Sequence, residues 1–289
     1  MKNIVLILAL FMGFVVAATA QVEVELRLNQ EQFLPGEAIP LRVRVVNRSG
    51  QDLHFGDENW VTFTVEPKDG SIVEELGGHP VIAHNFDVAP SKMATTKPIN
   101  IAPFYKIQNS GRYSVTATVH IDSWSKDYTS KPKFFDVIHG NKIWEQTFGV
   151  PQPTNSSVEP EVRKYVLQQA SLLNRLSLYL KISDESENRV IKVLTIGSMI
   201  SFSNPQSQTD SRNFLHVLYQ EASQKYLHTV INCDGEIILR ETYLYSTEAP
   251  HFKTNKFGDI AIEGGQKTPS ENDIPPALKN IDATPTANP

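Results

Sequence analysis

Residues 32–49 read QFLPGEAIPLRVRVVNRS, and this stretch decides the fold of the first half of the chain. Its Pro35-Gly36 turn signal lies between two alternating runs, VEVEL at residues 22–26 and LRVRV at residues 41–45. Apolar residues at every second position place one row of side chains on a core and the opposite row in water. The pattern is typical of an antiparallel β-sandwich and predicts a scaffold rather than a chemistry.

Further short strands follow this pair. Residues 61–65 alternate, Lys68-Asp69-Gly70 marks a tight turn, and residues 71–74 are β-prone again, which predicts a hairpin. Residues 93–101 predict a looser strand, residues 111–119 alternate most cleanly, and residues 134–138 close the set. With no helical pattern among them, these strands predict an all-β fold that begins with an immunoglobulin-like β-sandwich over residues 21–139.

The entry to the 111–119 strand, Asn-Ser-Gly-Arg-Tyr, suits the tyrosine corner of immunoglobulin-like sandwiches, which predicts a structural role for Tyr113. The order "PGE, strand, N-x-S turn, F-x-V hairpin with DG, then G-x-Y-x-V" over residues 33–119 resembles the immunoglobulin-like domains of the BsuPI proteinase-inhibitor type. The resemblance implies a sandwich and offers proteinase inhibition through a rim loop as one alternative function. It assigns no inhibitory residue in this chain.

The second half begins with a connecting strand and linker over residues 140–160. Residues 143–150 could continue the last strand or cover the sandwich end, and the proline-rich stretch after them is typical of a linker. Residues 161–180 fit a helical stripe in part, yet Leu176, Leu178 and Leu180 alternate strictly. We predict two strands here, with one short helix as the alternative.

Residues 161–265 predict a second antiparallel β-sheet domain. Three runs form a meander, residues 214–220, 225–232 and 236–245, and further short strands follow on both sides of Gly258. These units resemble β-propeller blades, but they are too few for a closed ring, which needs at least about four blades. The proline-rich residues 266–289 predict a disordered tail.

Residues 1–20 have the composition of a secretory signal peptide. Lys2 precedes an apolar run, and Ala18-Thr19-Ala20 is a small-x-small cleavage site. We therefore expect an exported protein, in the periplasm, on the cell surface or outside the cell, with no stable membrane insertion after cleavage. The net charge of −5 and the interspersed signs argue against nucleic-acid binding, and an unknown protein or glycan is the expected partner.

The sequence carries no pattern of a metal, cofactor or catalytic site. The loop around His54 lacks the ligand spacing of a calcium site, and His79 and His84 share no helical face. His216 and His228, in adjacent predicted strands, are each expected on a pleat face with a hydrogen bond. No nucleophile elbow, phosphate loop or dinucleotide fingerprint is present, so we expect no cofactor and a non-enzymatic protein.

Two other motifs carry weaker expectations. Cys233, the single cysteine, has no adjacent basic residue that would activate its thiol, so we expect it to flank a turn without reacting. Asn47 and Asn155 each begin an N-glycosylation acceptor pattern, and both are expected to be exposed.

Aromatic residues are the best candidates for a binding surface. Trp124 and Tyr128 lie in a polar loop at a predicted sandwich rim, where binding residues are usually carried. The alternative for Trp124 is that it folds back to cap the sandwich, since tryptophan is highly buried on average. Trp60 and Trp144 are expected in packing roles. The sequence thus predicts an exported, non-enzymatic binding or structural module, with a proteinase inhibitor or a glycan-binding or glycan-active surface protein as alternatives.

Overall fold

The computed structural model describes residues 21–55, 60–80, 82, 86–151, 161–172 and 175–275. The predicted signal peptide, most of the linker and residues 276–289 lie outside these ranges. The chain divides into two compact units. Unit 1 comprises residues up to Glu31, Ile39–Lys106 and Gly111–Phe135, and unit 2 comprises Gln32–Ala38, Ile107–Ser110 and Asp136 onward.

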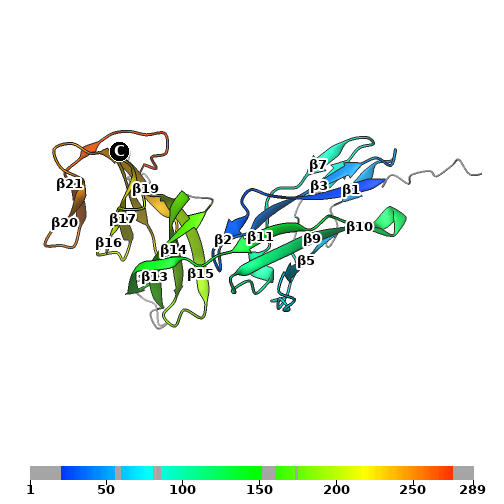
Figure 1. Ribbon diagram of the computed structural model, residues 1–289, viewed down its shortest axis with the longest axis horizontal. Helices are drawn as coiled ribbons and strands as arrows, with labels where there is room; N and C mark the ends of the chain where they lie inside the picture. The colour runs from blue at the N-terminus through cyan, green and yellow to red at the C-terminus, as the bar shows by residue number, and fades with distance from the viewer. Residues whose placement is uncertain are drawn as a thin grey trace, which may run out of the picture. The chain divides into compact units, whose positions relative to one another are not determined.

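Unit 1 contains two main sheets (Figure 1). In the first, β3 (Pro40–Asn47) is central and pairs antiparallel with β1 (Val22–Leu28) on one side and with β7 (Met93–Thr95) and β8 (Ile99–Asn100) on the other. In the second, β9 (Gly111–Ile121) pairs antiparallel with β5 (Val61–Pro67) and with β10 (Lys126–Thr129), and β11 (Lys133–Val137) continues along the same sheet. This strand order matches that of an immunoglobulin-like sandwich.

The core of unit 1 follows from the period-two pattern. Alternate residues of β3, β5 and β9 are buried, including Leu41, Val43, Val115 and Val119, none of which is accessible to solvent. Tyr113 at the start of β9 is buried and stacks on Phe135. The alternation that predicted these strands therefore also predicted which of their faces is buried.

Short elements complete unit 1. The strands β4 (Leu53–Phe55) and β6 (Phe86–Val88) pair with each other, and η1 (Ala102–Phe104) and η2 (Asp122–Trp124) are single 3-10 turns. Trp60 is buried and stacks on Phe86, in agreement with its predicted packing role.

One predicted hairpin of unit 1 does not form. Residues 71–74 are not a strand beside β5; that stretch is followed by one isolated bridge, between Glu75 and Tyr105. Ile72 is 95% exposed, so the β-prone run contributes no core residue. The prediction from the Asp69-Gly70 turn was wrong because the chain after the turn bonds to residues 104–106 instead of β5: the Lys106 N–H donates to the Glu74 carbonyl, and the Leu76 N–H donates to the Phe104 carbonyl.

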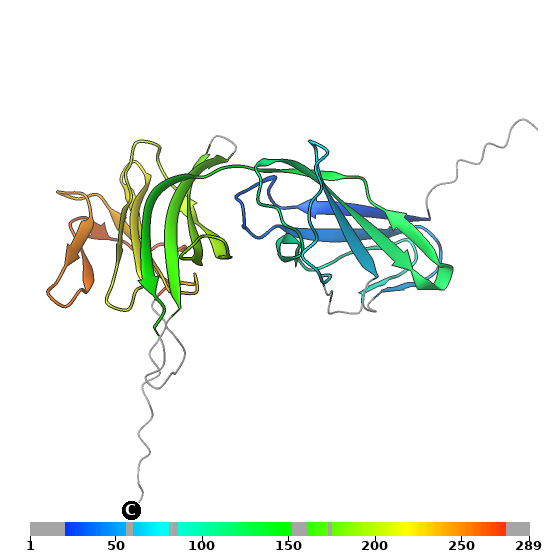
Figure 2. The ribbon, with the colours of Figure 1, turned by 90° about the horizontal axis from the view of Figure 1, so that it is seen from below.

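Unit 2 also has two main antiparallel sheets (Figure 2). The first is a meander of β12 (Asn141–Gly149), β13 (Val162–Leu172), β14 (Arg175–Asp184) and β15 (Val190–Ser198). The second runs β16 (Gln206–Thr209), β17 (Leu215–Ala222), β18 (Lys225–Ile231), β19 (Ile237–Leu244) and β22 (Gln266–Lys267). The prediction of strands rather than a helix over residues 161–180 is confirmed, and the helical alternative is wrong.

The two sheets of unit 2 enclose a common core. Tyr165, Leu178 and Leu180 of the first sheet pack in one buried cluster with Leu215 and Tyr219 of the second. Trp144 of β12 packs against the same cluster, which is a packing role as predicted. All-β architecture with several antiparallel sheets, as predicted from the sequence, thus holds for both units.

The opening stretch contributes to both units. The stretch begins with β2 (Gln32–Phe33), which pairs in parallel with the last two residues of β11. Leu34, the next residue, packs with Tyr179 in a second buried cluster of unit 2. The predicted Pro35-Gly36 turn is present, with Gly36 at φ +80°. An added Cβ at Gly36 would lie 2.9 Å from Val190, so this position requires glycine for space as well as for its backbone angle.

The C-terminal part of unit 2 is more ordered than the sequence indicated. A hairpin of β20 (His251–Thr254) and β21 (Ile260–Glu263) turns at Gly258. Residues 266–275, which were placed in the disordered tail, form β22 and an isolated bridge between Ile274 and Arg240. Within the described residues, no helix has the length and apolar character needed to cross a membrane.

Candidate functional site

Trp124 and Tyr128, the two predicted ligand-binding residues, lie close together at one end of unit 1. Trp124 ends η2, and Ser125 at φ +46° reverses the chain into β10, which carries Tyr128. The rings meet edge to face with centroids 6.3 Å apart, and both side chains are half-buried. The Trp124 indole N–H donates to Oε1 of Gln51 at 3.1 Å, which fixes the orientation of the ring.

A hollow of about 320 Å³ lies beside the Trp124 ring, lined by Gln21, Ser49, Gln51, Trp124 and Lys126. The lining side chains other than the indole are an amide, a hydroxyl, a second amide and an ammonium group. Within the described part of the chain, no hydrogen bond or ion pair engages the side chains of Gln21 and Lys126. These groups are therefore available to hydrogen-bond a ligand placed against the indole.

Tyr128 lines a neighbouring, larger hollow. This hollow, of about 510 Å³, runs along β1 from Val22 to Arg27 and is closed on the other side by Tyr128–Lys133. Because side chains alternate along a strand, Lys126 and Tyr128 point to one side of β10, and Asp127 and Thr129 to the other. The two aromatic residues thus join two adjacent hollows on the same edge of unit 1, which we call the Trp124 surface.

A charged cluster borders the Trp124 surface. His120 of β9 contacts Asp127 through Nδ1 at 2.5 Å and Asp122 through Nε2 at 3.3 Å. The hydrogen bond to Asp127, together with both negative charges, raises the pKa of His120 above its ordinary value. Three groups of this kind suggest a metal, but within the described residues no His, Cys, Asp or Glu cluster has the arrangement to hold one.

A third hollow of unit 1, about 570 Å³, is a poorer candidate. It is mostly apolar, with Phe86, Pro98 and Phe104 in its lining. Two of its polar side chains already bond to the backbone: Thr96 Oγ1 accepts from the Val43 N–H, and Asn100 Oδ1 accepts from the Ile39 N–H. A ligand there would find few free polar groups to fix its orientation.

The remaining predicted positions are structural. His54 forms an exposed ion pair with Asp87, and His79 is exposed, whereas His84 and Asn155 lie outside the described residues. The prediction that Asn47 is exposed is wrong. Its side chain is fully buried because its amide donates to the carbonyls of Gln51 and Val88, so it cannot accept a glycan in the folded protein.

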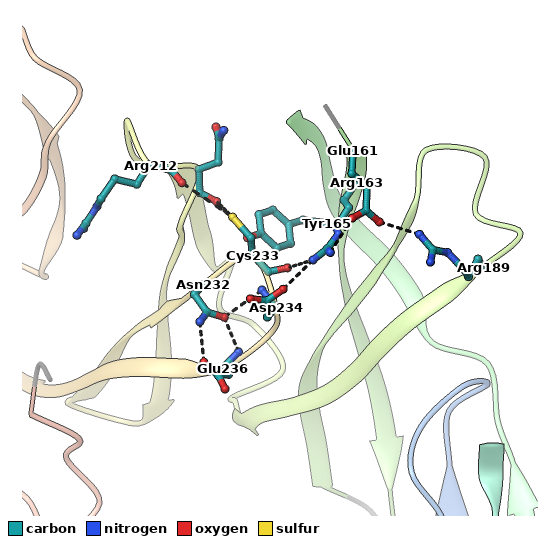
Figure 3. Close-up of polar contacts among 10 residues, drawn as sticks. Glu161, Arg163, Tyr165, Arg189, Arg212, Asn232, Cys233, Asp234 and Glu236 are labelled. Atoms are coloured by element: carbon teal, nitrogen blue, oxygen red, sulfur yellow. Dashed lines mark hydrogen bonds and ion pairs between the residues drawn. The ribbon is translucent and has the colours of Figure 1, made fainter. Parts of the chain in front are cut away.

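Cys233 belongs to a network that joins the two sheets of unit 2 (Figure 3). Its buried thiol shares its one hydrogen between the carbonyls of Asn213, at 3.7 Å, and Arg212, at 3.9 Å, and burial raises its pKa. Arg163 of β13 donates to the Cys233 carbonyl at 2.9 Å and to Asp234 at 3.0 Å. A buried thiol with a raised pKa is a poor nucleophile, so this network has a structural role.

The strand pattern placed His216 and His228 in adjacent strands but did not predict that they contact each other. The register of β17 and β18 places them diagonally on one face, with His216 Nδ1 3.0 Å from His228 Nε2. Asp210 and Glu241 lie at the two ends of the pair. A usable signal was the turn at residues 223–224, because a tight turn there sets the register that brings these two positions together.

Comparisons with known proteins identify no family for the chain. No protein-family model matches it, and no curated protein matches it. Among solved structures, the sporulation control protein Spo0M from Bacillus subtilis matches with a TM-score of 0.30 at 9% sequence identity, over 62% of this chain and 91% of that chain. A likeness at this level supports no conclusion about fold or function, so the function is argued from the site alone.

Proposed function

We propose that this protein is an exported, non-enzymatic binding module that binds carbohydrate at the Trp124 surface. The observation that carries the proposal is the convergence of polar groups beside a fixed indole ring, of which, among the described residues, the side chains of Gln21 and Lys126 are free to bind a ligand. The hollow next to Trp124 receives amide, hydroxyl and ammonium groups from three separate segments, at Gln21, at Ser49 and Gln51, and at Lys126.

This combination suits a sugar ring. A pyranose has an apolar face of C–H groups that packs on an aromatic ring, and a rim of hydroxyls that both donate and accept hydrogen bonds. The Gln51 side chain already orients the indole, so binding would not have to restrict that ring further. The Tyr128 hollow along β1 offers room for further sugar units of a chain.

A polysaccharide array probed with the full chain tests the proposal. We expect binding to at least one polysaccharide class and a loss of at least tenfold in affinity with Trp124→Ala. Phe257→Ala removes another exposed aromatic side chain, on the β20–β21 hairpin of unit 2, and should leave binding unchanged. Absence of binding, or equal loss in both variants, would reject the proposal. Inhibition in a protease panel would instead favour the proteinase-inhibitor alternative.

A further inference from the structure

The histidine pair, His216 of β17 and His228 of β18, is the most unusual polar feature of unit 2. The residues are 7% and 4% exposed, and their rings stack with centroids 5.2 Å apart. Nδ1 of His216 lies 3.0 Å from Nε2 of His228, so one of these nitrogens carries a proton and the other accepts it. The pair is buried, and its shared hydrogen bond needs one ring to act as donor.

A carboxylate faces the outer nitrogen at each end of the histidine pair. Asp210 Oδ2 lies 3.7 Å from Nε2 of His216, and Glu241 Oε2 lies 3.6 Å from Nδ1 of His228. These separations are within ion-pair range but too long for a hydrogen bond, and neither outer nitrogen has a hydrogen-bond partner among the described residues. Nε2 of His216 and Nδ1 of His228 are therefore buried without a hydrogen bond among the described residues.

Both carboxylates are ionised. Burial opposes this at Asp210, but hydrogen bonds from the Arg212 side chain and from the Phe214 and Arg212 N–H groups lower its pKa overall. The facing His228 ring, with Lys267 and Tyr243, lowers the pKa of Glu241 to about 2 against the effect of burial. The histidine pair thus lies between two fixed negative charges.

The β20–β21 hairpin covers the histidine pair. Phe252 presents its ring edge-on to both imidazoles, with centroids 6.3 Å from His216 and 5.7 Å from His228. Two hydrogen bonds fasten the hairpin to β16: the Phe252 N–H donates to Gln206 Oε1, and Gln208 Nε2 donates to Thr254 Oγ1. Figure 1 shows the hairpin next to β16.

The charged groups of the hairpin are outside this contact and pair with one another. Glu263 binds Lys253 at 2.7 Å and faces His251 at 3.7 Å, and all three side chains are exposed. The hairpin therefore meets the histidine pair through Phe252 rather than through a charge.

A count of protons shows how this site responds to acid. With both rings neutral, one proton lies in the shared bond and one at an outer nitrogen, so the other outer nitrogen turns a lone pair toward a carboxylate. One added proton places an N–H at both ends and keeps the shared bond. We infer that the histidine pair binds a single added proton, and that a second proton separates the two rings and releases the β20–β21 hairpin. The pair is thus an acid-sensitive switch.

The second proton cannot be accommodated in the observed geometry. It would place two N–H groups head to head across 3.0 Å and bury two adjacent positive charges. Burial, and to a lesser extent the charge of His228, lowers the pKa of His216 to about 4. This low pKa agrees with weak binding of a second proton by the pair. Separation of the rings would remove the surface on which Phe252 packs; within the described part of the chain, two hydrogen bonds to β16 would then hold the hairpin.

The test is an NMR titration of the imidazole rings in the full chain from pH 8 to pH 3.5, with amide hydrogen exchange measured alongside. We expect two coupled steps shared by both rings, the second near pH 4. Across that step the protection of amides in β20 and β21 should fall at least tenfold relative to amides of β13. Two independent titrations, or hairpin protection that is unchanged through the second step, would overturn the inference.

Two variants locate the effect. His216→Gln keeps a polar side chain that cannot be protonated, and it should remove the acid-dependent change in hairpin protection. His251→Gln removes the exposed histidine of the hairpin itself and should preserve the change; its loss in this variant would assign the switch to the His251–Glu263 contact and overturn the inference. If His216→Gln fails to fold, the wild-type titration still decides.

Discussion

Replacement of Arg163 by methionine tests how the two sheets of unit 2 are joined. Arg163 of β13 donates to the Cys233 carbonyl and to Asp234 in the β18–β19 turn, and its other terminal nitrogen donates to Glu161 at 2.8 Å. Its side chain is only 13% exposed. Methionine keeps the aliphatic packing but removes all three bonds and leaves the Cys233 carbonyl without this donor.

The magnitude follows from burial. Hydrogen bonds to a charged group contribute about 1.5–3 kcal/mol net, and loss of the Arg163 group should cost unit 2 about 2–3 kcal/mol of unfolding free energy. Arg189 is the matched control, because it binds the other oxygen of the same Glu161 at 2.7 Å but is 66% exposed. Exposed ion pairs contribute about 0.2–1 kcal/mol, so Arg189→Met should cost well under 1 kcal/mol.

Amide exchange in the full chain under increasing urea gives both values, with amides of β13 and β14 for unit 2 and amides of β9 for unit 1. The unit 1 amides should be unaffected by either substitution. An equal loss of unfolding free energy in Arg163→Met and Arg189→Met would refute this account, because it would show that burial does not strengthen the hydrogen bonds of Arg163.

Three further outcomes follow from the same structure. Folding lowers the pKa of His216 from 6.5 to about 4, so below pH 6.5 the unfolded chain binds a proton that the folded chain does not bind. The unfolding free energy of unit 2 should therefore fall by about 1.4 kcal/mol per pH unit between pH 6.5 and pH 4, as measured by amide exchange of β17. Gly197→Ala would place a Cβ 2.2 Å from the buried Tyr219 hydroxyl and should cost about 1–3 kcal/mol by urea unfolding, whereas Gly149→Ala meets nothing within 4 Å and should cost far less. Asp127→Asn removes the largest influence on the pKa of His120 and should lower that pKa in an NMR titration; an unchanged value would show that Asp122 alone sets it.

Local patterns predicted the strands well where one face is buried. The alternation at residues 111–119 and 41–45 gave β9 and β3 with the correct buried face, and strict alternation at Leu176–Leu180 favoured strand over helix correctly. Partner choice is not a local property. The Asp69-Gly70 turn is consistent with a hairpin, but the residues after it bond to residues 104–106, which lie farther along the chain, and not to β5.

The candidate sites show the same contrast between features that depend on local sequence and features that depend on distant segments. Trp124 and Tyr128 could be selected from the sequence because their polar loop left an aromatic pair unexplained by any strand period; the structure brings the two rings together, and ligand binding there stays a prediction. The histidine pair depends on the register between β17 and β18 and on Asp210 and Glu241 from two other segments. Burial of Asn47 likewise depends on β6, whose Val88 carbonyl accepts its amide.

The most direct test of the proposed function is an NMR titration of the full chain with an oligosaccharide from the polysaccharide class that binds best, followed at the three tryptophan indole N–H signals. The proposal predicts that the Trp124 signal shifts progressively to saturation while the signals of the buried Trp60 and of Trp144, which packs against the unit 2 core, remain in place. Saturable binding without a shift at Trp124 would contradict it.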